Sequence, residues 1–397
     1  MTSPSDIVIV SFARTPMGAF QGQFSTVTAP ELGAAAIQAV VERSGINADQ
    51  IDASFMGCVL SAGLGQAPAR QATLGAGLPL QVNCTTINKI CGSGLHTVML
   101  AHDLINAGTH QVMLAGGMES MTNAPYLLDK ARQGYRMGHG QVLDHMMLDG
   151  LQDAYQDKPT PMGCFAEATA GRYDFSREQQ DEFAIESLRR ANQAINSKAF
   201  DSQITPVTVK SRKGETVYDT DEQPGKAQPE KIPSLRPAFV KDGTVTAANS
   251  SSISDGAAAV MMTTREVAEA QGLTPIATIK GHATYSREPE WFTLAPVGAM
   301  QALLDKLDWT VSEVDLFEIN EAFAVVTMAA MHDLKIPHDK VNIHGGACAL
   351  GHPIGASGAR ILVTLLAALQ DKQLKTGIAS LCIGGGEAVA MAVELEG

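Results

Sequence analysis

The sequence Thr86-Ile87-Asn88-Lys89-Ile90-Cys91-Gly92-Ser93-Gly94-Leu95 places one cysteine between an apolar approach and a glycine-rich turn. Apolar residues then recur at spacings of three and four, which predicts a helix that begins close to Cys91 and runs to Gly108. A thiol at a helix N-terminus faces unpaired backbone N–H groups and the positive end of the helix dipole, and both favour the thiolate. Cys91 is therefore a candidate nucleophile. Packing is the alternative, because free cysteines are among the most buried residue types.

Around this stretch, short apolar strands alternate with helical patterns. We expect strands at 7–12, 53–60, 81–86 and 111–115, and helices at 30–43 and 67–74. This alternation predicts an α/β protein built from βαβ units with a largely parallel sheet.

The region 121–245 has a different character, because polar residues and scattered prolines replace the alternation. Ser176 and Gln179 form a capping box that predicts one helix. Residues 223–237 hold four prolines and are expected to be a loop. We interpret the region as an insertion that covers a site.

The second half of the chain repeats the organisation of the first. Three ordered matches have nearly the same offset: 51–57 with 314–320, Ser93-Gly94 with Ser357-Gly358, and Gly116-Gly117 with Gly384-Gly385. They predict a duplicated domain, divided into 1–120 plus 246–273, an inserted 121–245, and 274–397. Two similar halves would bring their loops together at the junction, where pockets tend to form.

Composition limits the function. A formal net charge of −13 argues against a nucleic-acid surface. No apolar run approaches the length of a membrane span. The cysteines lack CxxC pairing, which argues against a zinc site or a disulfide framework and for a reducing, cytoplasmic location. These six cysteines are Cys58, Cys84, Cys91, Cys164, Cys348 and Cys382. We interpret five histidines as structural, namely His96, His102, His139, His145 and His344.

Six motifs in order make the sequence specific. They lie at 88–94, 116–121, 255–259, 320–324, 345–358 and 382–386. On these motifs the chain resembles the thiolase family over essentially its whole length, and within it the acetyl-CoA C-acetyltransferases most closely. The resemblance implies a five-layered α-β-α-β-α duplicated fold with an inserted loop domain.

The resemblance also implies catalytic roles for five residues. Cys91 would take the acyl group as a thioester, and His352 would remove its proton. Cys382 would act as the second acid and base. One oxyanion hole would come from His352 with a water held by Asn320, and the other from the backbone N–H groups of Cys91 and Gly384.

Substrate contacts follow from the same resemblance. Ser251 matches a serine that binds the pantetheine arm of coenzyme A, and Phe292 lies where a methionine commonly borders the acyl pocket. Lys226 is the candidate replacement for an arginine near the adenine. Met162 follows Pro161 where a histidine is usual. The remaining wall residues are Ala322, Phe323 and Phe239.

The implied activity interconverts two acetyl-CoA with acetoacetyl-CoA and coenzyme A through acetyl-Cys91, with no metal or redox cofactor. Coenzyme A is then substrate and product, and the protein a homotetramer or dimer of fatty acid metabolism. One alternative is a degradative 3-ketoacyl-CoA thiolase, suggested by the serine-rich run 250–254. Another is a non-catalytic acyl-CoA or lipid carrier on the same fold. A ketoacyl synthase is disfavoured, because Cys382 stands where such enzymes carry a histidine.

Overall fold

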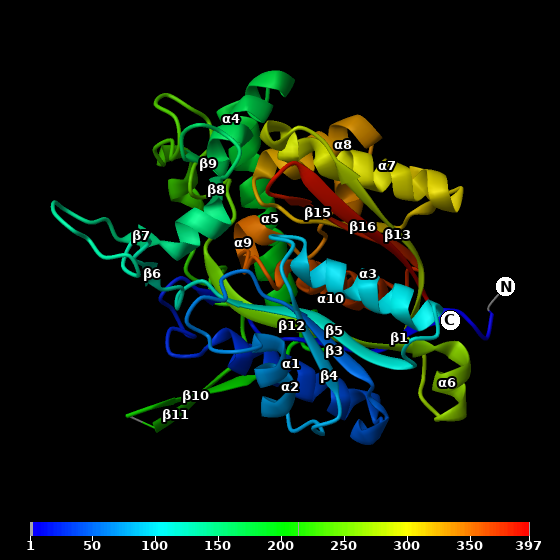
Figure 1. Ribbon diagram of the computed structural model, residues 1–397. Coiled ribbons are helices and arrows are strands. Elements are labelled where there is room, and N and C mark those ends of the chain that lie inside the picture. Colours follow the sequence, from blue (N-terminus) through cyan, green and yellow to red (C-terminus); the bar gives the residue numbers. More distant parts are fainter. Residues whose placement is uncertain (1–2, 213, 397) are drawn as a thin grey trace.

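The computed structural model describes residues 3–212 and 214–396, and five layers are visible in it (Figure 1). Two layers of strands enclose a layer of two helices, and further helices cover the outer face of each sheet. The predicted five-layered α/β fold is therefore present. The predicted domain limits include positions 1, 2, 213 and 397, which lie outside the described residues.

The sheets are continuous through one junction, in the order β14-β15-β16-β13-β1-β12-β5-β3-β4, with β2 paired to β12. At the junction, β1 and β13 pair only at Val8 with Thr278 and Ile9 with Ala277. The first half contributes β1 (Ile7–Arg14), β2 (Gly18–Ala19), β3 (Ala53–Gly57), β4 (Asn83–Ile87), β5 (Val112–Ser120) and β12 (Ser254–Thr264). The second contributes β13 (Ala277–Ser286), β14 (Leu316–Ile319), β15 (Thr376–Ile383) and β16 (Glu387–Leu395).

The strand directions correct the sequence-based expectation of a largely parallel sheet. Among the named strands of the described residues, β3 pairs parallel with β4 and β5, and β14 with β15, whereas β12, β16, β1 and β13 form antiparallel pairs. The reason is visible between β15 and β16, which only Gly384, Gly385 and Gly386 connect. Gly385 and Gly386 have φ of 94° and 89°, and such a tight hairpin requires antiparallel neighbours.

The two halves repeat each other strand by strand. β3, β5, β12 and β1 have the same neighbours and relative directions as β14, β15, β16 and β13. Phe317 of β14 also forms an isolated parallel bridge with Val341, where the first half has β4. The duplication predicted from three short matches is therefore present in the topology, while the predicted domain limits stay a prediction.

Helices cover both sheets. The outer layers contain α1 (Ala29–Ser44), α2 (Pro68–Gly75), α7 (Ala295–Leu307) and α8 (Ala324–Leu334), and the central layer α3 (Ser93–Asn106) and α10 (Ser357–Lys372) (Figure 1). Two short helices are α6 (Arg265–Ala270) and α9 (Ala347–Leu350).

The central helices approach closely because each begins with Ser-Gly. A Cβ on Gly94 would lie 2.7 Å from the nitrogen of Ala359, and one on Gly358 only 2.3 Å from that of Leu95. Any side chain at either position would push the helices apart, which explains why the two sequence matches both contain glycine.

The inserted region lies at one end of the sheets. It holds α4 (Met162–Tyr173), α5 (Arg177–Asn196), and the short strands β6 (Tyr126–Leu127), β7 (Leu143–Asp144), β8 (Gln152–Asp153) and β9 (Thr160–Pro161). The hairpin of β10 (Val207–Ser211) and β11 (Gly214–Tyr218) projects from the body, as does the arm of β6 and β7 (Figure 1). The capping box of Ser176 and Gln179 starts α5 as predicted. The expected loop 223–237 contains a short 3-10 turn, Pro229–Ser234.

A buried ion pair fastens the inserted region to β1. The guanidinium of Arg14 donates to both carboxylate oxygens of Asp221 at 2.7 and 2.8 Å, and both side chains are fully buried. Within the described ranges, no helix is long and apolar enough to cross a membrane.

Candidate active site

Cys91 lies in the turn that leads into α3, at the junction of the halves. Ser93 shapes this turn, because its Oγ accepts a hydrogen bond from the N–H of Lys89 at 2.8 Å and donates to the carbonyl of Ile90 at 2.7 Å. Ile90 has a φ of 47°, a left-handed conformation that is unfavourable for a β-branched residue. The hydrogen bonds of Ser93 therefore fix the turn before Cys91, and the backbone strain lies at Ile90.

Two opposing effects act on the Cys91 thiol. Burial raises its pKa to about 11, while hydrogen bonds from the backbone N–H groups of Gly384 and Cys91 favour the thiolate. Burial is the larger effect, so the helix N-terminus does not by itself ionise the thiol at neutral pH. Cys91 therefore needs a base. The two N–H groups that converge beside its sulfur come from opposite halves of the molecule.

Cys382 lies at the end of β15 and is completely buried. Burial raises the pKa of its thiol well above the usual value, and the neighbouring Cys91 raises it further. The two cysteines thus interact across the junction although 291 positions separate them in the chain, from 382 − 91.

His352 is held in one tautomer by Ser357. Its Nδ1 lies 2.5 Å from Oγ of Ser357, which itself donates to the carbonyl of Pro353 at 2.9 Å. Because that hydroxyl hydrogen is already used, Oγ accepts from the ring, and Nδ1 carries the proton. Burial, and then the charge of Arg360, lower the pKa of His352 to about 3. The ring is therefore neutral, with a lone pair on Nε2.

Several buried polar atoms lack a partner within the described ranges. They include Nε2 of His352 and both Oδ1 and Nδ2 of Asn320, whose residue is fully buried. An unpaired buried polar group costs ~1–3 kcal/mol, so proteins rarely retain one without a use. These atoms are suited to bind water or the polar atoms of a ligand.

Sequence reasoning gave no role to Glu119, which the structure places in this region. Its buried carboxylate accepts hydrogen bonds from the N–H groups of Val59, Leu60 and Gly355, at 2.9 to 3.1 Å. Burial raises the pKa of Glu119 to about 7, and its charge raises the pKa of Cys91. Glu119 thus ties the loop that carries His352 to the first half. An acidic residue at the end of an otherwise apolar strand was the available signal.

Most of the predicted substrate residues lie together. One apolar cluster contains Cys382 with Met162, Phe239, Phe292, Ala322 and Phe323. The rings of Phe239 and Phe292 both meet the ring of Phe323 edge to face, at 5.9 and 6.5 Å. Ser251 adjoins the cluster, because its N–H donates to the carbonyl of Ala322 at 3.0 Å. Aromatic rings therefore confine the space around Cys382.

Lys226 lies outside this cluster. Its ammonium pairs with Glu222, and it lines a pocket of about 330 Å³ together with Lys231 and Ser252. The carbonyl of Ser252 accepts a hydrogen bond from the N–H of His352 at 3.1 Å. Ser252 therefore lines this pocket and also holds the loop of His352.

Comparison with known proteins identifies the family. The thiolase N-terminal domain matches residues 7–266, and the thiolase C-terminal domain matches residues 273–395. The chain belongs to the thiolase family.

Curated relatives of this thiolase span almost its full length. An acetyl-CoA acetyltransferase of Cupriavidus necator is 48% identical over 393 residues, which cover 98% of this chain and 99% of that protein. Acetyl-CoA acetyltransferase 1 of Arabidopsis thaliana is 48% identical over 98% of this chain and 94% of its own. The family that the sequence motifs predicted is thereby confirmed.

Solved structures agree with the fold of the thiolase. The acetyl-CoA acetyltransferase of Bacillus anthracis superposes with a TM-score of 0.96 at 39% identity, covering 99% of both chains. A thiolase of Ascaris suum in complex with coenzyme A gives 0.93 at 40% identity, covering 98% of this chain and all of that one.

Proposed function

We propose that this thiolase is an acetyl-CoA C-acetyltransferase that condenses two acetyl-CoA to acetoacetyl-CoA and coenzyme A and catalyses the reverse thiolysis. The relatives with this name support the reaction. The observation that carries the proposal is that the Cys91 turn packs on the end of β15: a Cβ on Gly92 would lie 2.4 Å from the side chain of Ile383, the residue after Cys382. The N–H of Gly384 also bonds to the Cys91 sulfur. In this proposal His352, whose ring is neutral, serves as the base for Cys91, and the two thiols supply the nucleophile and the second acid and base.

The first half-reaction forms the acyl-enzyme. Nε2 of His352 takes the proton of Cys91, and the sulfur attacks the carbonyl carbon of acetyl-CoA. The carbon–sulfur bond to coenzyme A then breaks, and the leaving thiolate takes the proton of Cys382. Coenzyme A departs, leaving acetyl-Cys91, protonated His352 and the thiolate of Cys382.

The second half-reaction forms the carbon–carbon bond. The Cys382 thiolate removes an α-proton from a second acetyl-CoA, and the carbanion attacks the carbonyl of acetyl-Cys91. As that bond forms, the Cys91 thiolate leaves and regains its proton from His352. The raised pKa of Cys382 suits this step, because a weakly acidic proton requires a strong base.

Two sets of donors would stabilise the negative oxygen of each step. His352 and a water held by Asn320 would serve one carbonyl oxygen, and the N–H groups of Cys91 and Gly384 the other. Removing one such donor typically costs ~10²–10³ in rate. The scheme uses no metal and no redox cofactor.

Intact-protein mass spectrometry after brief exposure to acetoacetyl-CoA tests the proposal. We expect one acetyl adduct on the wild type and on the control Cys84→Ala, and none on Cys91→Ala. An unmodified wild type, as a non-catalytic carrier would give, would overturn the proposal.

Chain-length preference is tested separately. The rings of Phe239, Phe292 and Phe323 beside Cys382 favour a short acyl group. We expect faster thiolysis of acetoacetyl-CoA than of 3-ketoacyl-CoAs with eight or more carbons. A preference for the long substrates would instead identify a degradative 3-ketoacyl-CoA thiolase.

For the assembly we propose a homotetramer of fatty acid metabolism in the cytoplasm. Apolar side chains on the projecting arm support self-association, since Tyr126, Leu128 and Met137 are 68%, 54% and 99% exposed. Light scattering should give four copies for the wild type and fewer for Met137→Lys combined with Leu128→Lys. An unchanged mass would exclude the arm as an interface.

A further inference from the structure

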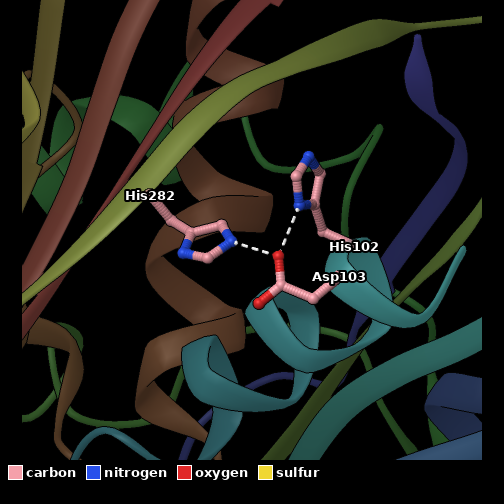
Figure 2. Close-up of side chains that lie close together, drawn as sticks. All are labelled: His102, Asp103 and His282. Atoms are coloured by element: carbon pink, nitrogen blue, oxygen red, sulfur yellow. Dashed lines mark hydrogen bonds and ion pairs between the residues drawn. The ribbon is translucent and has the colours of Figure 1, made fainter. Parts of the chain in front are cut away.

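A cluster of three metal-ligating side chains lies away from both cysteines, where the two halves meet. Figure 2 shows His102 and Asp103 on α3 and His282 on β13, with both imidazole rings directed at the carboxylate of Asp103. Oδ1 of Asp103 lies 3.1 Å from Nδ1 of His102 and 2.9 Å from Nε2 of His282. The three atoms lie within 4.8 Å of one another.

These distances suit a tetrahedral ion. Zn²⁺ binds imidazole nitrogen and carboxylate oxygen at about 2.0–2.2 Å, so ligand atoms at two corners of the tetrahedron are about 3.3 Å apart. Two of the three separations are slightly shorter than this, and the third, between the two imidazole nitrogens, is at most 4.8 Å. Side-chain rotations would have to open the first two separations to admit an ion between the three groups. Two imidazoles with one carboxylate form a ligand set that binds Zn²⁺ in preference to Mg²⁺, because Mg²⁺ favours oxygen ligands.

The surroundings contain charges of both signs, because the ammonium of Lys306 donates to the carbonyl of His282 at 3.2 Å and opposes a cation, whereas the helix dipole favours one. His102 and Asp103 lie near the C-terminal end of α3, where the helix dipole is negative. The side chains of His102 and His282 are 18% and 14% exposed, whereas Asp103 is 58% exposed and leaves an approach from solvent.

We propose that His102, Asp103 and His282 form a Zn²⁺ site whose fourth position is taken by water. The ion would join α3, whose first turn follows Cys91, to β13 of the other half. It would thereby stabilise the contact between the halves without taking part in the acyl transfer. The inference is independent of the proposed function, and its test does not use the reaction.

Titration of the metal-free protein with ZnCl₂ in a calorimeter tests the site. The titration uses a Cys91→Ala/Cys382→Ala background, because thiolates also bind zinc. We expect one equivalent of tight binding, weakened at least ~100-fold by His282→Gln, since even a lost outer-shell partner commonly costs 10–100-fold. Asp103→Asn keeps the shape of the side chain and should also weaken binding.

The matched control is His332→Gln. His332 and Asp333 are likewise consecutive on a helix, with Nδ1 2.9 Å from Oδ1, but they belong to no three-residue cluster in the ranges that the structure describes. We expect Zn²⁺ affinity within threefold of the unsubstituted background. Zn²⁺ should raise the unfolding temperature of the background and of this control, but not of His282→Gln, and Mg²⁺ should raise none.

Cobalt substitution identifies the ligands. Bound Co²⁺ should show the visible bands of a nitrogen and oxygen site without a sulfur charge-transfer band. The absence of tight Zn²⁺ binding, equal affinity in His282→Gln and His332→Gln, or a thiolate band would each overturn the proposal. The cluster would then be a hydrogen-bonded group only.

Discussion

Oγ of Ser357 lies 2.5 Å from Nδ1 of His352 and accepts a hydrogen bond from its N–H, which leaves Nε2 as the free base of the ring. The serine is the first residue of α10 and the histidine lies five positions earlier, so the helix start fixes the ring. A mechanism that depends on Nε2 therefore depends on this hydroxyl.

Replacing Ser357 with alanine should lower kcat by about 10-fold to 100-fold with little change in KM, because the tautomer and the ring orientation are no longer fixed. Steady-state kinetics of acetoacetyl-CoA thiolysis measure this. Thr73→Val is the control, since it also removes one buried hydroxyl bond to a backbone carbonyl, in α2. Equal effects in both variants would assign Ser357 a purely structural role.

Replacing Cys382 with alanine should separate the half-reactions. Acetyl transfer from acetyl-CoA to Cys91 needs no proton from carbon, so exchange of labelled coenzyme A into acetyl-CoA should persist at reduced rate. Condensation should fall by at least ~10³-fold, because the proposed scheme assigns removal of the α-proton to the Cys382 thiolate. Loss of both activities to the same degree would contradict a separate role for Cys382.

The pH dependence of stability should reveal Glu119. Its pKa in the folded protein is about 7, above the usual 4.5, so this group stabilises the fold below pH 4.5 and the contribution is lost as the pH rises through 7. Relative to Glu119→Gln, the unfolding free energy of the wild type should fall by about 2 kcal/mol between pH 5.5 and 8. Denaturant unfolding at both pH values measures it. A wild type that gains stability relative to the variant would show that the carboxylate titrates at a low pKa.

Breaking the buried pair of Arg14 and Asp221 should destabilise the attachment of the inserted region. Asp221→Ala leaves an unpaired buried guanidinium and should cost ~3–5 kcal/mol. The exposed Asp219→Ala should cost almost nothing, and Arg14→Met combined with Asp221→Leu should recover much of the loss. Chemical denaturation compares the three. If the double variant is no more stable than Asp221→Ala, the packing rather than the charge decides.

Much of the fold was accessible from local sequence. Apolar periodicity, the cap at Ser176 and the glycine after α1 located α1, α2, α3 and α5, because these signals act within one turn, but α4, α7 and α8 were not predicted. Strand direction was not accessible in this way. The connection after a strand decides the direction of the next one. Because a glycine hairpin rather than a helix follows β15, β16 pairs antiparallel with it, and the expectation of a largely parallel sheet was wrong.

The sequence alone determined the family and the duplication, since motif order and spacing survive in one dimension. The tertiary structure decided which ring nitrogen of His352 is free, that Glu119 holds the loop around it, and that Lys226 lies apart from the cluster around Cys382. It also brought His282 to His102 and Asp103. Most of these relationships depend on burial and on contacts between residues more than a hundred positions apart, and the tautomer depends on a single hydrogen bond. A local sequence pattern does not encode any of these features.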